Sequence, residues 1–279
     1  MIAITGATGQ LGQFVVKQLA AEYPTDQTVL IVRNKQKAID LFGDNYVIRE
    51  AEYNDKPALT EALNGVEKLL LISSSEVGQR KVQHENVVDA AIASKVSFIA
   101  YTSLLHADTS ELGLAVEHLS TEAYLKTSGI KYALLRNGWY SENYLASVPA
   151  AIEHGALIGA AKDGKIASAA REDYAAAAVK VLLAEQIEAA KVYELAGDES
   201  YTLSELAALI SEKAGKEIPY VNMSAEEYKG ALEQAGLPTP IADLLANSDA
   251  GAAKGGLYDN SKTLSTLIGK PTTAIKSML

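Results

Sequence analysis

The sequence predicts an α/β protein in which a doubly wound parallel sheet is followed by a smaller, mostly helical region. Short apolar runs alternate with segments of helical periodicity through the first half of the chain, and this alternation is typical of parallel strands joined by helices. Several runs are continuously apolar, as expected for strands that helices cover on both faces. With 279 residues, the chain is long enough for one large domain or two unequal domains.

The predicted elements follow one another in a regular order. In the first helix Leu11, Val15 and Leu19 recur at helical spacing, and Gly129 is placed to end the fifth helix. After residue 137 the alternation weakens, and the last part of the chain is helical and punctuated by glycine and proline. Strands are predicted at 2–5, 28–32, 46–51, 68–72, 96–101, 132–135, 156–158, 166–169 and 192–195, and helices at 10–22, 35–42, 56–64, 79–94, 111–128 and 171–186.

A glycine-rich segment with the spacing G-x-x-G-x-x-G runs from Gly6 to Gly12, between the first strand and the first helix. One glycine permits a tight turn, another lets a pyrophosphate approach the backbone, and the third allows close packing of helix on strand. We therefore predict a Rossmann-type dinucleotide site, with a glycine turn that binds nothing as the alternative. The predicted contacts are Gly6, Ala7, Thr8, Gly9, Gln10 and Leu11.

The end of the second predicted strand indicates which dinucleotide binds. An NAD-selective site carries an acidic residue there to hold the ribose hydroxyls, but this strand is followed by Arg33 and Asn34. The guanidinium of Arg33 suits a 2′-phosphate, which predicts NADP(H); a solvated surface arginine is the alternative. Ser73, Ser74 and Ser75 end the fourth strand and are predicted to border the cofactor, although a polar turn with a helix cap accounts for at least one of them.

Composition excludes several classes of function. Lys and Arg total 25 and Asp and Glu 35, so the net charge is 25 − 35 = −10, which disfavours nucleic acid and anionic membranes as partners. The absence of cysteine removes disulfides and thiol chemistry, and the four histidines are too scattered to predict a metal site. The chain begins without a targeting segment and has no apolar run long enough to span a membrane, so we expect a soluble, cytoplasmic protein.

Beyond these patterns, several segments resemble a known family. They are Gly6–Gly12, Arg33, 69–75, the run Arg136-Asn137-Gly138-Trp139-Tyr140-Ser141-Glu142-Asn143, 159–168 and 254–257. The chain resembles the NmrA-like branch of the atypical short-chain dehydrogenases along essentially its whole length, and within it the NAD(P)H:quinone oxidoreductases of the quinone oxidoreductase 2 type. The resemblance implies NADPH binding, a Rossmann domain with a small C-terminal domain, and two-electron quinone reduction.

One departure from ordinary short-chain dehydrogenases constrains the chemistry. Those enzymes use Tyr-x-x-x-Lys to exchange a proton with a carbonyl or alcohol, whereas our alignment places Leu114 and His118 in these two positions. Thr102 and Ser103 remain near the usual hydroxyl position. A quinone is already a strong electrophile, so the protein needs mainly to hold the ring near the nicotinamide, and direct hydride transfer without flavin or metal stays feasible.

The segment after the sixth strand supplies further candidates. Asn137 can hydrogen-bond the nicotinamide carboxamide, and Tyr140 and Asn143 can hydrogen-bond a quinone oxygen. For Trp139 and Tyr140 the alternative is packing between domains, and for His118 it is a structural role or an i,i+4 contact with Glu122. Arg171 is a candidate on the cofactor side, or it pairs with Glu172 or Asp173. The predicted cofactor contacts here are Asn137, Gly138, Trp139, Tyr140, Ser141, Glu142 and Arg171, and the predicted catalytic residues are Tyr140, Asn143 and His118.

The expected organisation is an NADP-binding Rossmann domain at 1–137, to which strands from about 156–198 return, and a smaller substrate-covering domain at 138–279. The quinone is expected to enter between them.

A redox sensor that binds NADP(H) without turnover is the alternative function, because such relatives also lack the catalytic pair. The fold is also compatible with a homodimer. His84, His106 and His154 are interpreted as solvated or capping residues.

Overall fold

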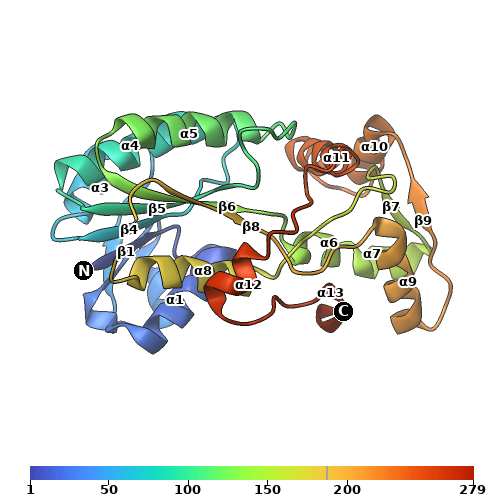
Figure 1. The fold of residues 1–279 in the computed structure, drawn as a ribbon, viewed down its shortest axis with the longest axis horizontal. Coiled ribbons are helices and arrows are strands. Elements are labelled where there is room, and N and C mark those ends of the chain that lie inside the picture. The colour runs from blue at the N-terminus through green and yellow to red at the C-terminus, as the bar shows by residue number, and fades with distance from the viewer. Residues whose placement is uncertain (187) are drawn as a thin grey trace. The chain divides into compact units, whose positions relative to one another are not determined.

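The computed structural model describes residues 1–186 and 188–279. Its main feature is a seven-stranded sheet with the strand order β3-β2-β1-β4-β5-β6-β8, and a second sheet pairs β7 with β9 (Figure 1). In the large sheet, β1 pairs with β2 and β4, β2 with β3, β4 with β5, and β5 with β6, all in parallel. The order reverses beside β1, as in Rossmann folds, so the predicted fold class is confirmed.

The strands are β1 (Ile2–Thr5), β2 (Thr28–Val32), β3 (Val47–Glu50), β4 (Lys68–Leu71), β5 (Phe98–Leu104), β6 (Lys131–Asn137), β7 (Leu157–Gly159), β8 (Lys191–Leu195) and β9 (Tyr220–Asn222). The helices are α1 (Gln10–Glu22), α2 (Lys35–Phe42), α3 (Lys56–Ala62), α4 (Arg80–Ala93), α5 (Ala115–Thr127), α6 (Ser141–Leu145), α7 (Val148–His154), α8 (Arg171–Leu183), α9 (Leu203–Ala214), α10 (Ala225–Gln234), α11 (Thr239–Ala252), α12 (Thr263–Ile268) and α13 (Ile275–Met278), with a 3₁₀ turn at Thr25–Gln27. Within the residues described, none of these helices has the length and hydrophobicity that crossing a membrane requires.

The seven strands of the large sheet lie within three residues of their predicted ends. Gly129 adopts a left-handed backbone, with φ of +77°, just beyond α5, as expected for a residue that ends a helix. The strand predicted at 166–169 is wrong. Ile166 and Ala169 form only isolated bridges, to Tyr201 and Tyr140, because this buried segment bonds to several different neighbours instead of one ladder.

The chain forms two compact units. The first comprises Met1–Ala107, Val116–Asn137 and Arg171–Tyr193, and the second comprises Asp108–Ala115, Gly138–Ala170 and Glu194–Leu279. Both units are discontinuous in sequence, because α8 and the start of β8 belong to the first unit. The division at 137 and 138 stays a prediction. Of the segments expected to return, β7 pairs with β9 in the second unit, whereas β8 joins the large sheet.

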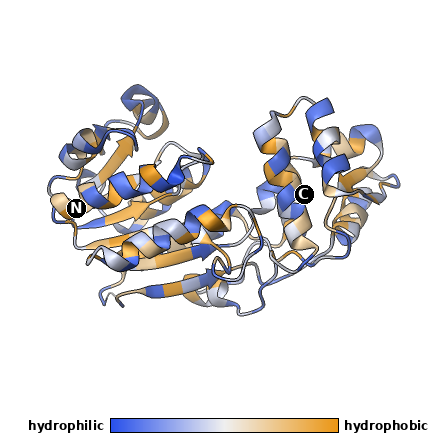
Figure 2. Ribbon diagram, turned by 90° about the horizontal axis from the view of Figure 1, so that it is seen from above, coloured by the Kyte–Doolittle hydropathy of each residue, from blue (hydrophilic) through white to orange (hydrophobic). Residues whose placement is uncertain are grey.

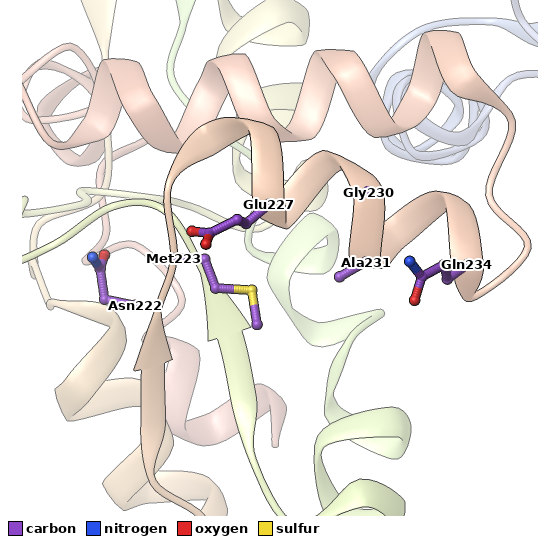
Figure 3. A pocket seen from close by; sticks show the side chains of 6 residues that line it. All are labelled: Asn222, Met223, Glu227, Gly230, Ala231 and Gln234. Atoms are coloured by element: carbon purple, nitrogen blue, oxygen red, sulfur yellow. The ribbon is translucent and has the colours of Figure 1, made fainter.

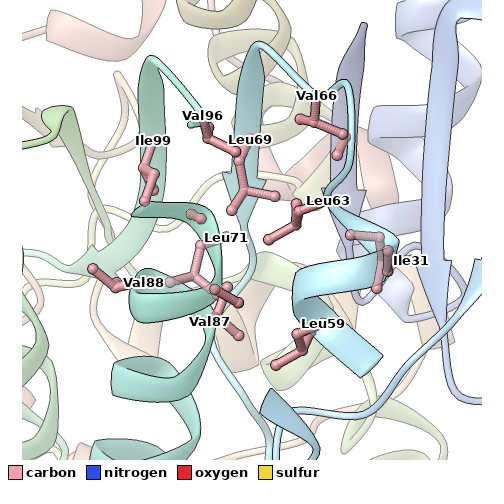
Figure 4. Close-up of a cluster of buried hydrophobic side chains, with 14 of the residues drawn as sticks. Ile31, Leu59, Leu63, Val66, Leu69, Leu71, Val87, Val88, Val96 and Ile99 are labelled. Atoms are coloured by element: carbon pink, nitrogen blue, oxygen red, sulfur yellow. The ribbon is translucent and has the colours of Figure 1, made fainter. Parts of the chain in front are cut away.

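The core of the first unit lies between the large sheet and the helices that cover it. Leu69 and Leu71 point to the face covered by α3, α4 and α5, where they meet Leu63 and Val88 (Figure 4). Helices α1 and α8 pack together over the opposite face (Figure 1). Because both faces are covered, the strands are hydrophobic along most of their length (Figure 2), which explains the continuous apolar runs of the sequence.

The turn between β1 and α1 leaves no room for a side chain at Gly12. A Cβ atom there would lie 2.3 Å from the carbonyl oxygen of Gly6 and 2.7 Å from that of Ala7. Gly6 itself has φ of +61°, and its carbonyl accepts a hydrogen bond from the Gly9 amide at 2.9 Å. The first and third glycines of the motif are therefore required by the backbone itself, whatever the turn binds.

We expect Gly12→Ala to lower the free energy of unfolding by about 3 kcal/mol, because the new methyl group overlaps backbone atoms that cannot move away. Gly230→Ala is the matched control. A Cβ at Gly230, in α10, meets nothing within 4 Å, and alanine should stabilise the helix by up to about 1 kcal/mol. Urea denaturation of both variants measures the difference. Equal stabilities would contradict the packing described here.

Candidate active site

The glycine turn and the start of α1 have the features of an anion site. Gly9 is the N-cap residue of α1 and makes no side-chain hydrogen bond to the helix, so no side chain covers the first-turn amides. Gly6, Gly9 and Gln10 are exposed, and Ala7 and Leu11 are buried. The carbonyl of Thr8 accepts a hydrogen bond from the Gln13 side chain at 3.2 Å, which fixes the turn from the helix side. These residues fit a pyrophosphate.

Arg33 follows β2 and forms an ion pair with Glu76. The Nη1 atom lies 3.2 Å from Oε1 of Glu76, and the two side chains are 71% and 45% exposed. Gln83 donates a hydrogen bond to the other carboxylate oxygen at 2.8 Å. An ion pair this exposed is weak, so the phosphate of a ligand can displace the carboxylate from the guanidinium. The prediction of Arg33 as a phosphate contact stays a prediction.

The three serines after β4 have different surroundings. The Ser73 amide donates to Thr102 Oγ1 at 2.8 Å, which ties the end of β4 to β5. Ser74 is buried, and its hydroxyl accepts from the Glu76 amide at 3.1 Å, as the polar-turn alternative expects. Ser75 is exposed. The hydroxyls of Ser73 and Ser75 are thus better placed than that of Ser74 for a ligand.

Asn137, the last residue of β6, contains a buried polar atom with no partner. The residue is 5% exposed, and its Oδ1 makes no hydrogen bond within the described chain. A buried acceptor that stays unsatisfied costs about 1–3 kcal/mol, so such an atom marks a place where a ligand donor is favourable. The amide group of a nicotinamide carboxamide is a donor of that kind. Asn137 therefore fits the predicted cofactor.

The residues that follow Asn137 belong to the second unit and divide into buried and accessible groups. Trp139 is 8% exposed and lies in an aromatic cluster with Tyr144, their ring centroids 6.5 Å apart. Ser141 is fully buried, with its hydroxyl 2.8 Å from that of Ser168. Tyr140 and Asn143 are partly exposed. They share the first turn of α6, where the Asn143 amide donates to the Tyr140 carbonyl at 3.0 Å.

Glu142, beside them, is also partly exposed, and Gly138 donates its amide to the Leu195 carbonyl at 2.7 Å. Arg171, the first residue of α8, is partly exposed and belongs to the first unit. The predicted contacts thus fall into two groups. The first unit contains Gly6, Ala7, Thr8, Gly9, Gln10, Leu11, Arg33, Ser73, Ser74, Ser75, His118, Asn137 and Arg171, and the second contains Gly138, Trp139, Tyr140, Ser141, Glu142 and Asn143.

His118 is buried and hydrogen-bonded. Its Nδ1 lies 2.8 Å from the hydroxyl of Tyr101, a residue of β5 that is itself fully buried. Burial, with the charge of Arg80 as a second cause, lowers the pKa of His118 from its usual 6.5 to about 3. The ring is therefore neutral at physiological pH, which agrees better with the structural alternative than with a general acid.

Glu122 pairs with Arg136 and Ser103. The Arg136 guanidinium donates to both carboxylate oxygens, at 3.0 and 2.7 Å, and the Ser103 hydroxyl donates to Oε1 at 2.5 Å. Glu122 therefore bonds to Arg136 and Ser103, and His118 bonds to Tyr101, in place of the i,i+4 contact between His118 and Glu122. Leu114 lies in a turn before α5, which begins at Ala115 and not at 111, so Leu114 and His118 do not share a helix.

Sequence reasoning missed two residues of this region. Tyr53, after β3, has its hydroxyl 2.7 Å from both Thr5 Oγ1 and the Ile72 carbonyl, and thereby joins the ends of β1 and β4. His84, interpreted above as solvated or capping, is fully buried and bonded to the loop after β4, so that interpretation is wrong. Neither residue belongs to a motif, and only the folded chain shows their contacts.

A pocket in the second unit lies away from all predicted residues. It is lined by Asn222, Met223, Glu227, Gly230, Ala231 and Gln234 (Figure 3). Two of its polar groups are already used, because the Glu227 carboxylate caps α10 and Asn222 Oδ1 accepts from the Lys162 amide at 2.8 Å. We assign it no chemistry. Throughout residues 1–186 and 188–279, no cluster of three His, Asp or Glu side chains is arranged to hold a metal ion.

The fold and the glycine turn define a Rossmann-type dinucleotide-binding protein. The chain matches the NmrA-like family over residues 1–274 and belongs to that family. It is 62% identical to quinone oxidoreductase 2 of Escherichia coli (strain K12) over 275 residues, which cover 99% of this chain and 96% of that protein.

Two solved structures are similar over nearly their whole length. The E. coli NADPH-dependent quinone oxidoreductase in complex with NADPH superposes with a TM-score of 0.97 at 61% identity, covering 100% of this chain and 98% of that one. A Citrobacter sp. triphenylmethane reductase in complex with NADP(H) gives a TM-score of 0.94 at 38% identity, covering 99% and 98%.

The buried histidines predict how stability depends on pH. The pKa values of His84 and His118 are about 3 in the folded chain, against 6.5 for an ordinary histidine. Between these values the unfolded chain binds protons that the folded chain does not. The free energy of unfolding should therefore fall as the pH is lowered below about 6.5, by about 1.4 kcal/mol per pH unit for each histidine.

His118→Gln and His84→Gln should each reduce this slope by the share of one histidine. Urea denaturation of the three proteins between about pH 4.5 and 7.5 measures the slopes. An identical slope in the wild type and in His118→Gln would show that His118 is not buried in its neutral form.

Proposed function

We propose that this chain is an NADPH-dependent quinone reductase that passes two electrons directly from nicotinamide to quinone, without flavin or metal. The observation that carries this proposal is the near full-length similarity to quinone oxidoreductase 2. The chain's own residues agree with it. The chain has the glycine turn, the cationic side chain of Arg33 after β2, and the unsatisfied buried acceptor Asn137 Oδ1 at the end of β6.

Each group of residues has a separate task in holding the cofactor. The amides of the glycine turn bind the pyrophosphate, Arg33 binds the 2′-phosphate, and Asn137 Oδ1 accepts a hydrogen bond from the carboxamide. Ser73 and Ser75 border the ribose. When bound, NADPH supplies the hydride that a quinone ring accepts. The protein's contribution is to hold the nicotinamide and the quinone ring in position and to exclude other reactions, since a quinone needs little further activation.

Tyr140 and Asn143 are proposed to hold the quinone through hydrogen bonds to its oxygens. Both are partly exposed and lie on one turn of α6. His118 stays a prediction as a catalytic residue. Its neutral ring is bonded to Tyr101, so we assign to water the one proton that the hydroquinone needs in addition to the hydride.

The alternative, a sensor that binds NADP(H) without turnover, rests only on the missing Tyr-x-x-x-Lys pair, which direct hydride transfer to a quinone does not need either. The family relative with 62% identity is named an oxidoreductase. A homodimer and a cytoplasmic location are part of the proposal. The location is supported by a sequence with no cysteine, which has no use for an oxidising compartment.

The cofactor preference is tested at Arg33. We expect Arg33→Ala to weaken NADPH binding about 10- to 100-fold, as the loss of a charge-assisted hydrogen bond predicts, and to change NADH binding little. Fluorescence titration of both cofactors measures the dissociation constants. Lys56→Ala is the control, because Lys56 forms an ion pair of the same exposed kind with Asp89, in the same unit. An unchanged preference for NADPH would refute the assignment of Arg33.

Turnover is tested by following NADPH absorbance with added benzoquinone. Wild type should oxidise NADPH in a quinone-dependent reaction, and Tyr140→Phe and Asn143→Ala should each lower kcat/KM about tenfold, the effect of one hydrogen bond to the substrate. Tyr132→Phe, at the opposite end of β6 from Asn137, should leave the rate unchanged. Tight NADPH binding without oxidation would favour the sensor.

A further inference from the structure

The loop after β4 is held by a buried histidine of the next helix. His84, in α4, is fully buried, and its Nε2 accepts a hydrogen bond from the Ser74 amide at 2.9 Å. A backbone N–H can only donate. The Nε2 atom of His84 must therefore be unprotonated for the contact to exist.

The other ring nitrogen fixes the tautomer. Nδ1 of His84 lies 2.8 Å from the hydroxyl of Thr121, in α5, and that hydroxyl donates to the Glu117 carbonyl at 3.1 Å. Since the neutral ring carries one proton, Nδ1 donates to Thr121. Burial, and secondarily the charge of Arg80, lowers the pKa of His84 to about 3, so this arrangement persists across the physiological range.

Further contacts hold the same short segment. Arg80, one turn before His84 in α4, donates from Nε to the Ser74 carbonyl at 2.6 Å. The Ser73 amide donates to Thr102 of β5. Two side chains of α4 thus hold both backbone polar groups of Ser74, while the following residues, 75–79, are exposed. The loop is fixed where it leaves the strand and open to solvent beyond.

This segment lies beside the glycine turn. A Cβ placed on Gly6 would be 3.6 Å from that of Ile72, the residue before Ser73. Strands β1 and β4 are also neighbours in the sheet. A displacement of the loop at Ser74 would therefore also shift the residues at the edge of the sheet where the pyrophosphate and ribose are proposed to bind.

We propose that His84 is a positioning residue for NADPH: by accepting the Ser74 amide it sets the conformation of Ser73–Ser75 that the cofactor requires. This inference rests on the proposed cofactor site. His84 does not touch the ligand in this scheme. Its effect is transmitted through one peptide group, so it should act on cofactor binding more than on the hydride-transfer rate.

Three variants test this role. His84→Leu removes the acceptor and should raise the dissociation constant for NADPH about tenfold, with kcat at saturating NADPH nearly unchanged. His84→Gln places a carbonyl oxygen near the position of Nε2 and should restore the dissociation constant to within about twofold of wild type. Val88→Ala, at a fully buried position of the same helix, should lower the melting temperature without changing NADPH binding.

A fourth variant, Thr121→Val, keeps the shape of the side chain but removes the nearer partner of Nδ1 and leaves the Tyr101 hydroxyl, at 3.5 Å, as the other. If His84→Leu does not fold, Thr121→Val replaces it and should weaken NADPH binding in the same direction. The positioning role is overturned if a folded His84→Leu or Thr121→Val binds NADPH as tightly as wild type. It is also overturned if Val88→Ala weakens NADPH binding equally. Neither outcome affects the proposed function. Failure of the wild type to bind NADPH overturns both.

Discussion

Gly12 brings the first turn of α1 into contact with the backbone of Gly6 and Ala7, in the turn that follows β1, and leaves no space there for a Cβ atom. An added Cβ would lie 2.3 Å from the Gly6 carbonyl oxygen. The proposed nucleotide site depends on this approach, because it fixes where α1 begins, and its N-cap residue Gly9 makes no side-chain hydrogen bond to the helix. Parallel strands end at a common edge, so one tight turn at β1 places its amides beside side chains from across the sheet.

That edge is polar and yet largely buried. Burying polar groups costs free energy unless each group has a hydrogen-bond partner. The partners come mostly from neighbouring strands and helices: Tyr53 joins Thr5, Thr102 joins Ser73, and Glu122 joins Ser103 and Arg136. Such pairing makes the edge stiff. Asn137 Oδ1 is an exception at the ends of the strands, and a buried acceptor without a partner marks a place where a donor from a ligand is favourable.

Sequence patterns were sufficient for the large sheet because its strands are buried on both faces and its helices have one apolar face. Runs such as Lys68–Leu71 allow few other interpretations. They were insufficient for the second unit, where 166–169 forms isolated bridges to different neighbours and β9 is three residues long and mostly exposed. In the candidate site, the glycine motif is a local signal that the sequence shows directly, and Arg33 stays a prediction. The contacts of Tyr53 and His84 follow from the packing of separate elements, and the sequence alone does not distinguish a buried histidine from an exposed one.

The exposure of Arg33 also bears on how this protein can change over time. Its side chain is 71% exposed, and in the part of the chain that the structure describes it forms an ion pair with the exposed side chain of Glu76. Its replacement should therefore leave the core unchanged. Gly12 is the opposite case, since the fold does not tolerate its replacement. Under the proposed assignment of Arg33, a substitution at the surface can therefore change the preference between NADPH and NADH, while the glycine turn and the sheet stay as they are.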